Sequence, residues 1–150
     1  MNINFFMNEA INQAKYAYDN GEVPVGGILV DSKTNTIIAK SYNKVNKEKN
    51  AIFHCEIDLI INACKKLSTK YLNNTIIFIT LEPCLMCASA ISKVHIEKVY
   101  FGAYDEKNGG IEKYKFLNNK KHNFKTEIYG GILENDCKYL LEKFFKKLRK

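Results

Sequence analysis

Residues 75–93 read TIIFITLEPCLMCASAISK, and this stretch decides how the rest of the chain is arranged. Its first six residues are apolar or β-branched, which is typical of a central β-strand. Pro83 fits the first turn of a helix, where its missing N–H is not needed, and that helix should run to about Lys93. The stretch therefore predicts a strand that leads into a helix, with Cys84 at the corner between them.

The flanking sequence predicts further strands and helices in alternation. We expect strands at residues 23–30, 37–40, 97–101 and 126–129, and helices up to about residue 20, from 54 to about 66 and from about 134. Residues 42–50 should form a polar loop, and the helix from 54 should direct Ile57, Ile60, Ile61 and Cys64 inward. This alternation predicts a single domain, residues 1–150, in which helices cover both faces of one sheet in three α/β/α layers.

Four residues near these corners form the pattern of a catalytic zinc site. His54 and Glu56 begin one predicted helix, and Cys84 and Cys87 lie three residues apart on one face of another. One imidazole and two thiolates leave a fourth zinc position open, whereas a structural zinc site uses four protein ligands. Glu56 is then a spare acid that can accept a proton from a water molecule whose pKa zinc lowers toward about 7.

Each part of this pattern has a simpler explanation when it is taken alone. A Cys-x-x-Cys pair can be a redox pair or half of a zinc knuckle, and a single His is more often an ordinary surface or core residue. The complete order, His-x-Glu followed by Pro-Cys-x-x-Cys, resembles the signature of zinc-dependent nucleobase deaminases. The whole set therefore favours hydrolytic deamination.

Composition limits the classes of protein to which the chain can belong. It is 46% hydrophobic and 26% charged, an ordinary globular balance, and no apolar run approaches the roughly 20 residues of a membrane span. The N-terminus lacks the layout of a secretory signal, and an odd count of five cysteines fits reduced thiols better than a disulfide scaffold. We expect a cytoplasmic protein with no membrane contact, in which Cys55, Cys64 and Cys137 are reduced and packed.

The net charge of +7 would suit a polyanionic partner such as RNA. Arg149 is the single arginine among 23 basic residues, so 22 are lysines. Lys, Asn and Ile all have AT-rich codons, so a skewed genome explains much of this charge. Residues 143–150, KFFKKLRK, concentrate the charge in one place, which indicates either RNA contact or the solvated end of a helix.

Segments along most of the chain, from about Asn8 to Lys147, resemble the TadA-type tRNA-specific adenosine deaminases of the cytidine and deoxycytidylate deaminase superfamily. They are EVPVG at 22–26, Asn43 eleven residues before His54, TLEPCLMC at 80–87, FGAYD at 101–105, GGIL at 130–133 and the pair Phe144-Phe145. The resemblance implies a cytidine-deaminase-like fold with a mixed five-stranded sheet. It also implies conversion of adenosine to inosine at the wobble position of a tRNA anticodon stem-loop, by a homodimer with RNA across both subunits.

The same resemblance implies a role for each matching residue. His54, Cys84 and Cys87 would bind one Zn²⁺ per subunit, and Glu56 would carry protons between the water and the base. The residues expected to bind substrate are Asn43, Val25, Leu81, Asp105, Phe144 and Phe145. Asn43 would hydrogen-bond the base and Asp105 would accept from a sugar hydroxyl, although loop capping by Asn43, a turn at Asp105 and core packing of the apolar residues are alternatives.

The sequence departs from the family at four places. Cys55 replaces the usual Ala between His54 and Glu56, and we expect its thiol to point away from the metal into the core. Residues 49–53 lack the usual Asp-Pro-Thr, and residues 111–114 differ from the family in a loop that borders the expected RNA site. Residues 121–123 match the family's Asn-His pair only in part, and His122 is either an RNA contact or, more simply, an ordinary surface residue. We expect His95 to lie in a connection between helix and strand, with no role in the site.

Two other functions fit the same motif. The chain could deaminate free nucleobases or nucleosides such as guanine, cytosine or cytidine, which would share the zinc chemistry but differ at the mouth of the site. It could also be a non-catalytic RNA-binding module stabilised by zinc, which would need a fourth protein ligand, with Cys55 as the candidate.

Overall fold

The computed structural model describes residues 1–112 and 124–149. Its helices are α1 (Ile3–Asp19), α2 (Val45–Glu48), α3 (Cys55–Leu67), α4 (Leu85–Lys93) and α5 (Glu134–Leu148). Its strands are β1 (Gly26–Asp31), β2 (Ile37–Tyr42), β3 (Thr75–Leu81), β4 (Lys98–Ala103) and β5 (Glu127–Tyr129). The expected alternation of strands and helices is therefore confirmed.

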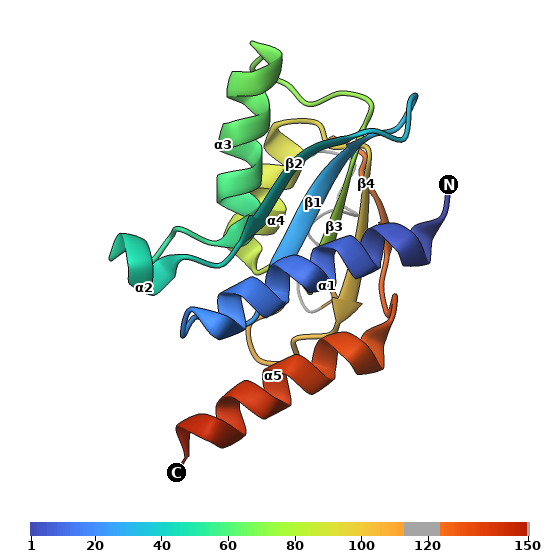
Figure 1. The fold of residues 1–150 in the computed structure, drawn as a ribbon. Coiled ribbons are helices and arrows are strands. Elements are labelled where there is room, and N and C mark those ends of the chain that lie inside the picture. The colour runs from blue at the N-terminus through green and yellow to red at the C-terminus, as the bar shows by residue number, and fades with distance from the viewer. Residues whose placement is uncertain (113–123, 150) are drawn as a thin grey trace.

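The strands form one mixed sheet in the order β2-β1-β3-β4-β5. β1 is antiparallel to both β2 and β3, whereas β4 is parallel to β3 and to β5. The parallel pair of β3 and β4 is connected by α4, as a parallel pairing requires a crossover. Figure 1 shows α1 and α5 on one face of the sheet and α3 and α4 on the other, which is the expected three-layer arrangement.

Each face of the sheet has its own hydrophobic core, because alternate strand residues point to opposite sides. Ile77 and Ile79 of β3 pack with α3 and α4, while Ile76 and Phe78 pack with α1 and α5. The backbone of α1 lies directly against β1. A Cβ atom added at Gly26 would lie 2.2 Å from the backbone nitrogen of Ala14, so the chain needs glycine there.

Three local predictions were wrong. The loop at 42–50 contains the short helix α2, and Pro83 precedes α4 because Cys84 is its N-cap residue. Ile61 is 42% exposed, since the buried stripe of α3 runs through Cys55, Glu56, Leu59, Ile60 and Ala63. The helix is rotated so that Glu56 faces inward, and this rotation carries Ile61 out to solvent.

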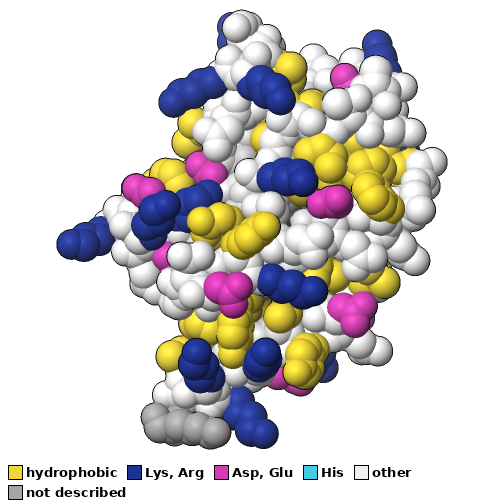
Figure 2. Space-filling view, in the orientation of Figure 1, with side chains coloured by type: hydrophobic (Ala, Val, Ile, Leu, Met, Phe, Trp, Pro, Cys, Tyr) yellow, Lys and Arg dark blue, Asp and Glu magenta, His cyan; other side chains and the backbone are white. Residues whose placement is uncertain are grey.

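Basic side chains are spread over the face shown in Figure 2, and several of them lie around the end of α5. Figure 2 shows Lys and Arg side chains around the C-terminal end of α5. Lys146 and Lys147 lie in the last turn of this helix, and Arg149 caps it. Within the described residues, no helix combines the length and the apolar character that crossing a membrane would require.

Candidate metal centre and active site

Three side chains from two helix starts converge on one point. The Nδ1 atom of His54 lies 3.7 Å from Sγ of Cys84 and 3.5 Å from Sγ of Cys87. With metal–sulfur bonds of about 2.3 Å and metal–nitrogen bonds of about 2.05 Å, tetrahedral zinc separates such atoms by roughly 3.6 Å. The donor set therefore fits a tetrahedral zinc ion without rearrangement.

The helix geometry frees the ligands to face this point. His54 is the N-cap residue of α3 and Cys84 is the N-cap residue of α4, and both have extended backbones. Neither side chain caps its helix, so both are available to a metal. Both helices also direct the positive ends of their dipoles toward the site, which stabilises thiolate at Cys84 and Cys87.

A hydrogen bond between the two thiols shifts their pKa values in opposite directions. The hydrogen bond with Cys87 lowers the pKa of the Cys84 thiol to about 4. The same hydrogen bond, together with burial, raises the pKa of the Cys87 thiol far above its ordinary value. The hydrogen bond with Cys84 raises the pKa of His54. Zinc binds cysteine as thiolate, so the proton that the two thiols share leaves when the metal binds.

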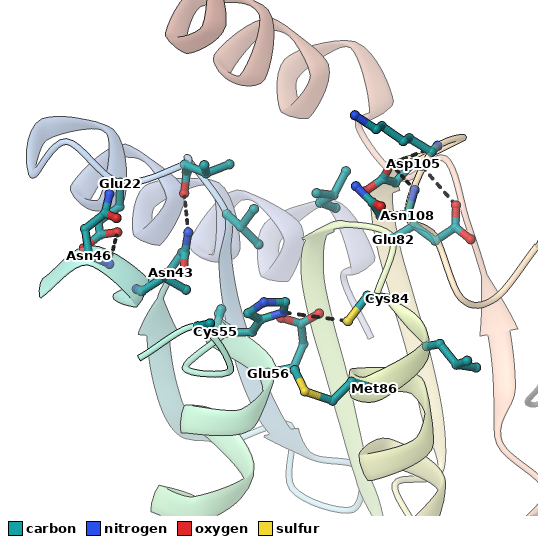
Figure 3. A pocket seen from close by; sticks show the side chains of 18 residues that line it. Glu22, Asn43, Asn46, Cys55, Glu56, Glu82, Cys84, Met86, Asp105 and Asn108 are labelled. Atoms are coloured by element: carbon teal, nitrogen blue, oxygen red, sulfur yellow. Dashed lines mark hydrogen bonds between the residues drawn. The ribbon is translucent and has the colours of Figure 1, made fainter. Parts of the chain in front are cut away.

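Glu56 is the acid beside the three donors. Its side chain is 4% exposed, and burial raises the pKa of its carboxyl to about 7. Figure 3 shows this carboxyl pointing toward Cys84. Among the described residues, the group of potential metal ligands consists of His54, Cys84 and Cys87, so Glu56 is near the metal position without being a ligand.

A cavity of about 640 Å³ opens above the donors, and its size is typical of a small-molecule site. Glu56 and two of the metal ligands lie in its lining. Figure 3 shows Asn43 on one side of this cavity and Asp105 and Asn108 on the other. The arrangement can therefore hold a planar ring between two walls while an acid and a metal act on one edge of it.

Comparison with known proteins identifies the kind of site. Residues 1–103 match the cytidine and deoxycytidylate deaminase zinc-binding region. The chain belongs to this deaminase family. The metal of this deaminase is accordingly zinc, held by His54, Cys84 and Cys87.

Individual relatives of this deaminase are similar over nearly its whole length. The tRNA-specific adenosine deaminase of Rickettsia bellii (strain RML369-C) is 42% identical over 144 residues, which cover 95% of this chain and 99% of that protein. The tRNA-specific adenosine deaminase of Bacillus subtilis (strain 168) is 41% identical, with 97% and 89% covered. A solved structure from work on A-to-I editing by tRNA:A34 deaminases at the wobble position of transfer RNA is 34% identical. It has a TM-score of 0.86 and covers 91% of this chain and 99% of that one.

The deaminase brings most of its predicted substrate residues to one place. Val25, Asn43, Leu81 and Asp105 all line the cavity above the zinc ligands. Phe144 and Phe145 lie outside it on α5, where Phe144 is buried and Phe145 is 42% exposed. Residues 121–123, where the sequence departs from the family, fall outside the described residues.

Cys55 does not serve as a fourth ligand. Its side chain is buried, and its thiol donates to the carbonyl oxygen of Ser41 over 3.2 Å. Burial raises the pKa of this thiol well above its ordinary value, which disfavours the thiolate that zinc would need. The expectation that Cys55 points into the core is confirmed, and among the described residues no fourth side chain joins His54, Cys84 and Cys87 as a ligand.

Two buried acids in the cavity lining were missed by sequence reasoning. The carboxylate of Glu22 accepts hydrogen bonds from the backbone N–H groups of Asn46 and Lys47, over 2.9 and 2.8 Å. Glu82 accepts from three backbone N–H groups of the opposite wall, the first of which belongs to Asp105. Both acids stand next to apolar segments in the sequence. An acid that is buried together with such a segment needs hydrogen-bonding partners, so this position was the one sign in the sequence that each acid has a structural role.

Proposed function

We propose that this chain is a zinc-dependent hydrolase that converts adenosine to inosine at the wobble position of a tRNA anticodon loop. The observation that carries the proposal is the buried Glu56 carboxyl beside a three-ligand zinc site, at the floor of an open cavity. The names of relatives that are similar over the full length support tRNA as the substrate. They favour it over a free nucleobase.

The reaction exchanges one bond at C6 of adenine for another. Zinc, when bound, lowers the pKa of water and so makes hydroxide available near neutral pH. Glu56 takes the proton of the attacking water as the C6–O bond forms and gives it to N1 of the ring. Glu56 then moves the proton of the new C6 hydroxyl to the exocyclic amine, so that the C6–N bond breaks, ammonia leaves and the C6 carbonyl of inosine forms. Its position beside the ligands would place the carboxyl within reach of each of these atoms once a base is bound.

Val25, Leu81 and Asn43 would form the binding site for the base. Val25 and Leu81 supply apolar walls at the ends of the strands. The Nδ2 atom of Asn43 donates to the carbonyl oxygen of Val23, and its Oδ1 atom accepts from the backbone N–H of Val45. An amide carries two N–H groups and two acceptor lone pairs, so one of each is left for the edge of a base.

Asp105 would meet the RNA backbone beside the target. Its Oδ1 atom accepts from the backbone N–H groups of Lys107 and Asn108, which is the turn-forming role weighed above. Its Oδ2 atom has no hydrogen bond within the described part of the chain and can accept one from a ribose 2′-hydroxyl. One carboxylate can therefore hold the turn and contact RNA at the same time.

A second cavity would guide the RNA strand away from the base site. It shares Leu81 and Asp105 with the first cavity and continues to Lys138 and Phe145 of α5. Phe145 is exposed in this cavity and could stack on a loop base, whereas Phe144 packs against Tyr18 in the core. The basic end of α5 in Figure 2 would then contact phosphates.

We extend the proposal to a single-domain homodimer in the cytoplasm. Three large apolar side chains within two residues of a zinc ligand are exposed in one chain, namely Ile52, Leu85 and Met86. A second copy could cover them. All five cysteines are free, which suits a reducing compartment. Light scattering should give twice the mass of one chain, and a monomer at micromolar concentration would contradict the dimer.

Inosine formation in synthetic anticodon stem-loops is the direct test. Purified protein with measured zinc content should convert a wobble adenosine and leave free guanine, cytosine and cytidine unchanged. A matched stem-loop with guanosine at the wobble position serves as the control substrate. Activity on the free bases alone would replace the proposed substrate with a small molecule.

A further inference from the structure

Glu82 is a buried acid that the reaction itself does not use. It follows β3 directly and precedes Pro83 and the zinc ligand Cys84. Its side chain is 3% exposed and lies in the lining of the reaction cavity. A carboxylate in this position is costly unless hydrogen bonds replace the water that it has lost.

Within the part of the chain that the structure describes, the hydrogen-bonding partners of this carboxylate all lie in one segment, residues 105–112. Its Oε1 atom accepts from the backbone N–H of Asp105 over 3.0 Å. Its Oε2 atom accepts from the backbone N–H groups of Ile111 over 3.2 Å and Glu112 over 2.9 Å. Figure 3 shows the bond that joins Glu82 to Asp105. One side chain thus ties both ends of the segment to the strand that leads to Cys84.

The middle of the segment is packed directly against the same carboxylate. A Cβ atom added at Gly109 would lie 2.5 Å from Cδ of Glu82 and 2.4 Å from the carbonyl oxygen of Asp105. The backbone N–H of Gly110 also donates to the carbonyl oxygen of Pro83 over 2.8 Å. Residues 105–112 are therefore built around Glu82, with no room for a side chain between them.

We propose that Glu82 is a positioning residue that fixes residues 105–112 as one wall of the reaction cavity. This wall carries Asp105, Lys107 and Asn108 into the cavity, on the side away from Asn43. The inference rests on the proposed function, because the wall matters for catalysis only if RNA enters between the two sides. A wall that is already ordered spares the RNA the entropy cost of ordering it on binding.

Hydrogen exchange of the zinc-loaded protein tests the anchoring without reference to activity. Glu82→Gln keeps the size of the side chain but places an NH₂ group against at least one N–H donor. Exchange at Asp105, Ile111 and Glu112 should accelerate about tenfold or more, while α3, α4 and the zinc content stay unchanged. Glu112→Gln is the matched control, because it removes the same charge from an exposed side chain of the same segment.

Unchanged exchange at these three amides in Glu82→Gln would overturn the inference. Equal acceleration throughout α3 and α4 would also overturn it, since Glu82 would then only support the fold as a whole. Gly109→Ala disturbs the same contact from the other side and leaves the carboxylate in place. Because both substitutions loosen one contact, their combined effect on exchange should be smaller than the sum of the two.

Kinetics on an anticodon stem-loop separate positioning from catalysis. Glu82→Gln should raise KM about tenfold and change kcat less than about threefold, because the wall holds RNA and not the reacting atoms. A loss confined to kcat would contradict the positioning role. If the native protein deaminates no RNA but the three amides still respond to Glu82→Gln, the proposed substrate fails while the anchoring of the wall stands.

Discussion

Glu56 is the side chain on which proton transfer depends. Replacing it with Gln keeps the shape of the buried group but removes the base, so deamination should fall by a factor of about 10² to 10⁴ or more. Zinc content should stay at one ion per chain, because Glu56 is not among the ligands. Rate measurement and metal analysis on the same sample decide the matter. Turnover within tenfold of the native protein would remove Glu56 from the mechanism.

Phe144 and Phe145 should respond in opposite ways to truncation. Phe144 is 7% exposed and packs edge-on against Tyr18, so Phe144→Ala should lower the free energy of unfolding by about 3–5 kcal/mol. Phe145 is 42% exposed, so Phe145→Ala should leave stability nearly unchanged and weaken RNA binding by about 1–3 kcal/mol. Denaturant unfolding and RNA titration of both variants test the pair. Native RNA affinity in Phe145→Ala would leave this side chain without a role in binding.

At the scale of the element, α5 presents its charges at one end. If Lys146 and Lys147 each contact a phosphate, replacing both with Ala should weaken binding and lower the slope of log K against log salt by about 1.4. Lys33 and Lys70, exposed and far from α5 in sequence, supply a control pair with the same loss of charge. If both pairs changed the slope equally, Lys146 and Lys147 would contribute only through the net charge of the protein and not through contacts with phosphates.

The zinc ligands and their helices could be predicted because the residues that indicate them lie within a few positions of one another in the sequence. Cys84 and Cys87 are three residues apart, and a proline marks the start of their helix. The anchoring roles of Glu22 and Glu82 could not be predicted in this way, since their partners lie 23 to 30 residues away. Sequence shows that an acid adjoins an apolar strand, but only the fold determines which distant N–H groups meet it.

The boundaries of elements were predicted less well for a related reason. Proline before a cysteine is compatible with either the first turn of a helix or the residue before its cap, and here Cys84 takes the cap position. Likewise Ile60 and Ile61 have the same apolar character, and the inward position of Glu56 decides which of them is buried. Tertiary contacts therefore decide where a helix begins and which of two adjacent apolar residues is buried, when the local sequence allows either.

At the scale of the whole molecule, zinc joins the starts of two helices that are far apart in the chain. His54 is the N-cap residue of α3, Cys84 is the N-cap residue of α4, and Cys87 lies in the first turn of α4. Metal that binds only the folded chain at 100 times its dissociation constant adds about 2.7 kcal/mol of stability. Adding zinc to chelator-treated protein should therefore raise its melting temperature. Cys84→Ala should abolish this rise, whereas Cys64→Ala, which removes a cysteine outside the metal group, should preserve it.

The two faces of the sheet pack against different pairs of helices. The core on one side packs against α3 and α4, whose starts carry the metal ligands and Glu56, and the core on the other side supports α5, which lines the second cavity. Alternating residues of β3 pack on opposite sides of the sheet, and Leu81 and Leu141 contact both clusters. A cavity-forming substitution in the core beneath α1 and α5 should therefore loosen α5 before it disturbs the metal donors, which lie at the starts of the helices on the opposite face of the sheet.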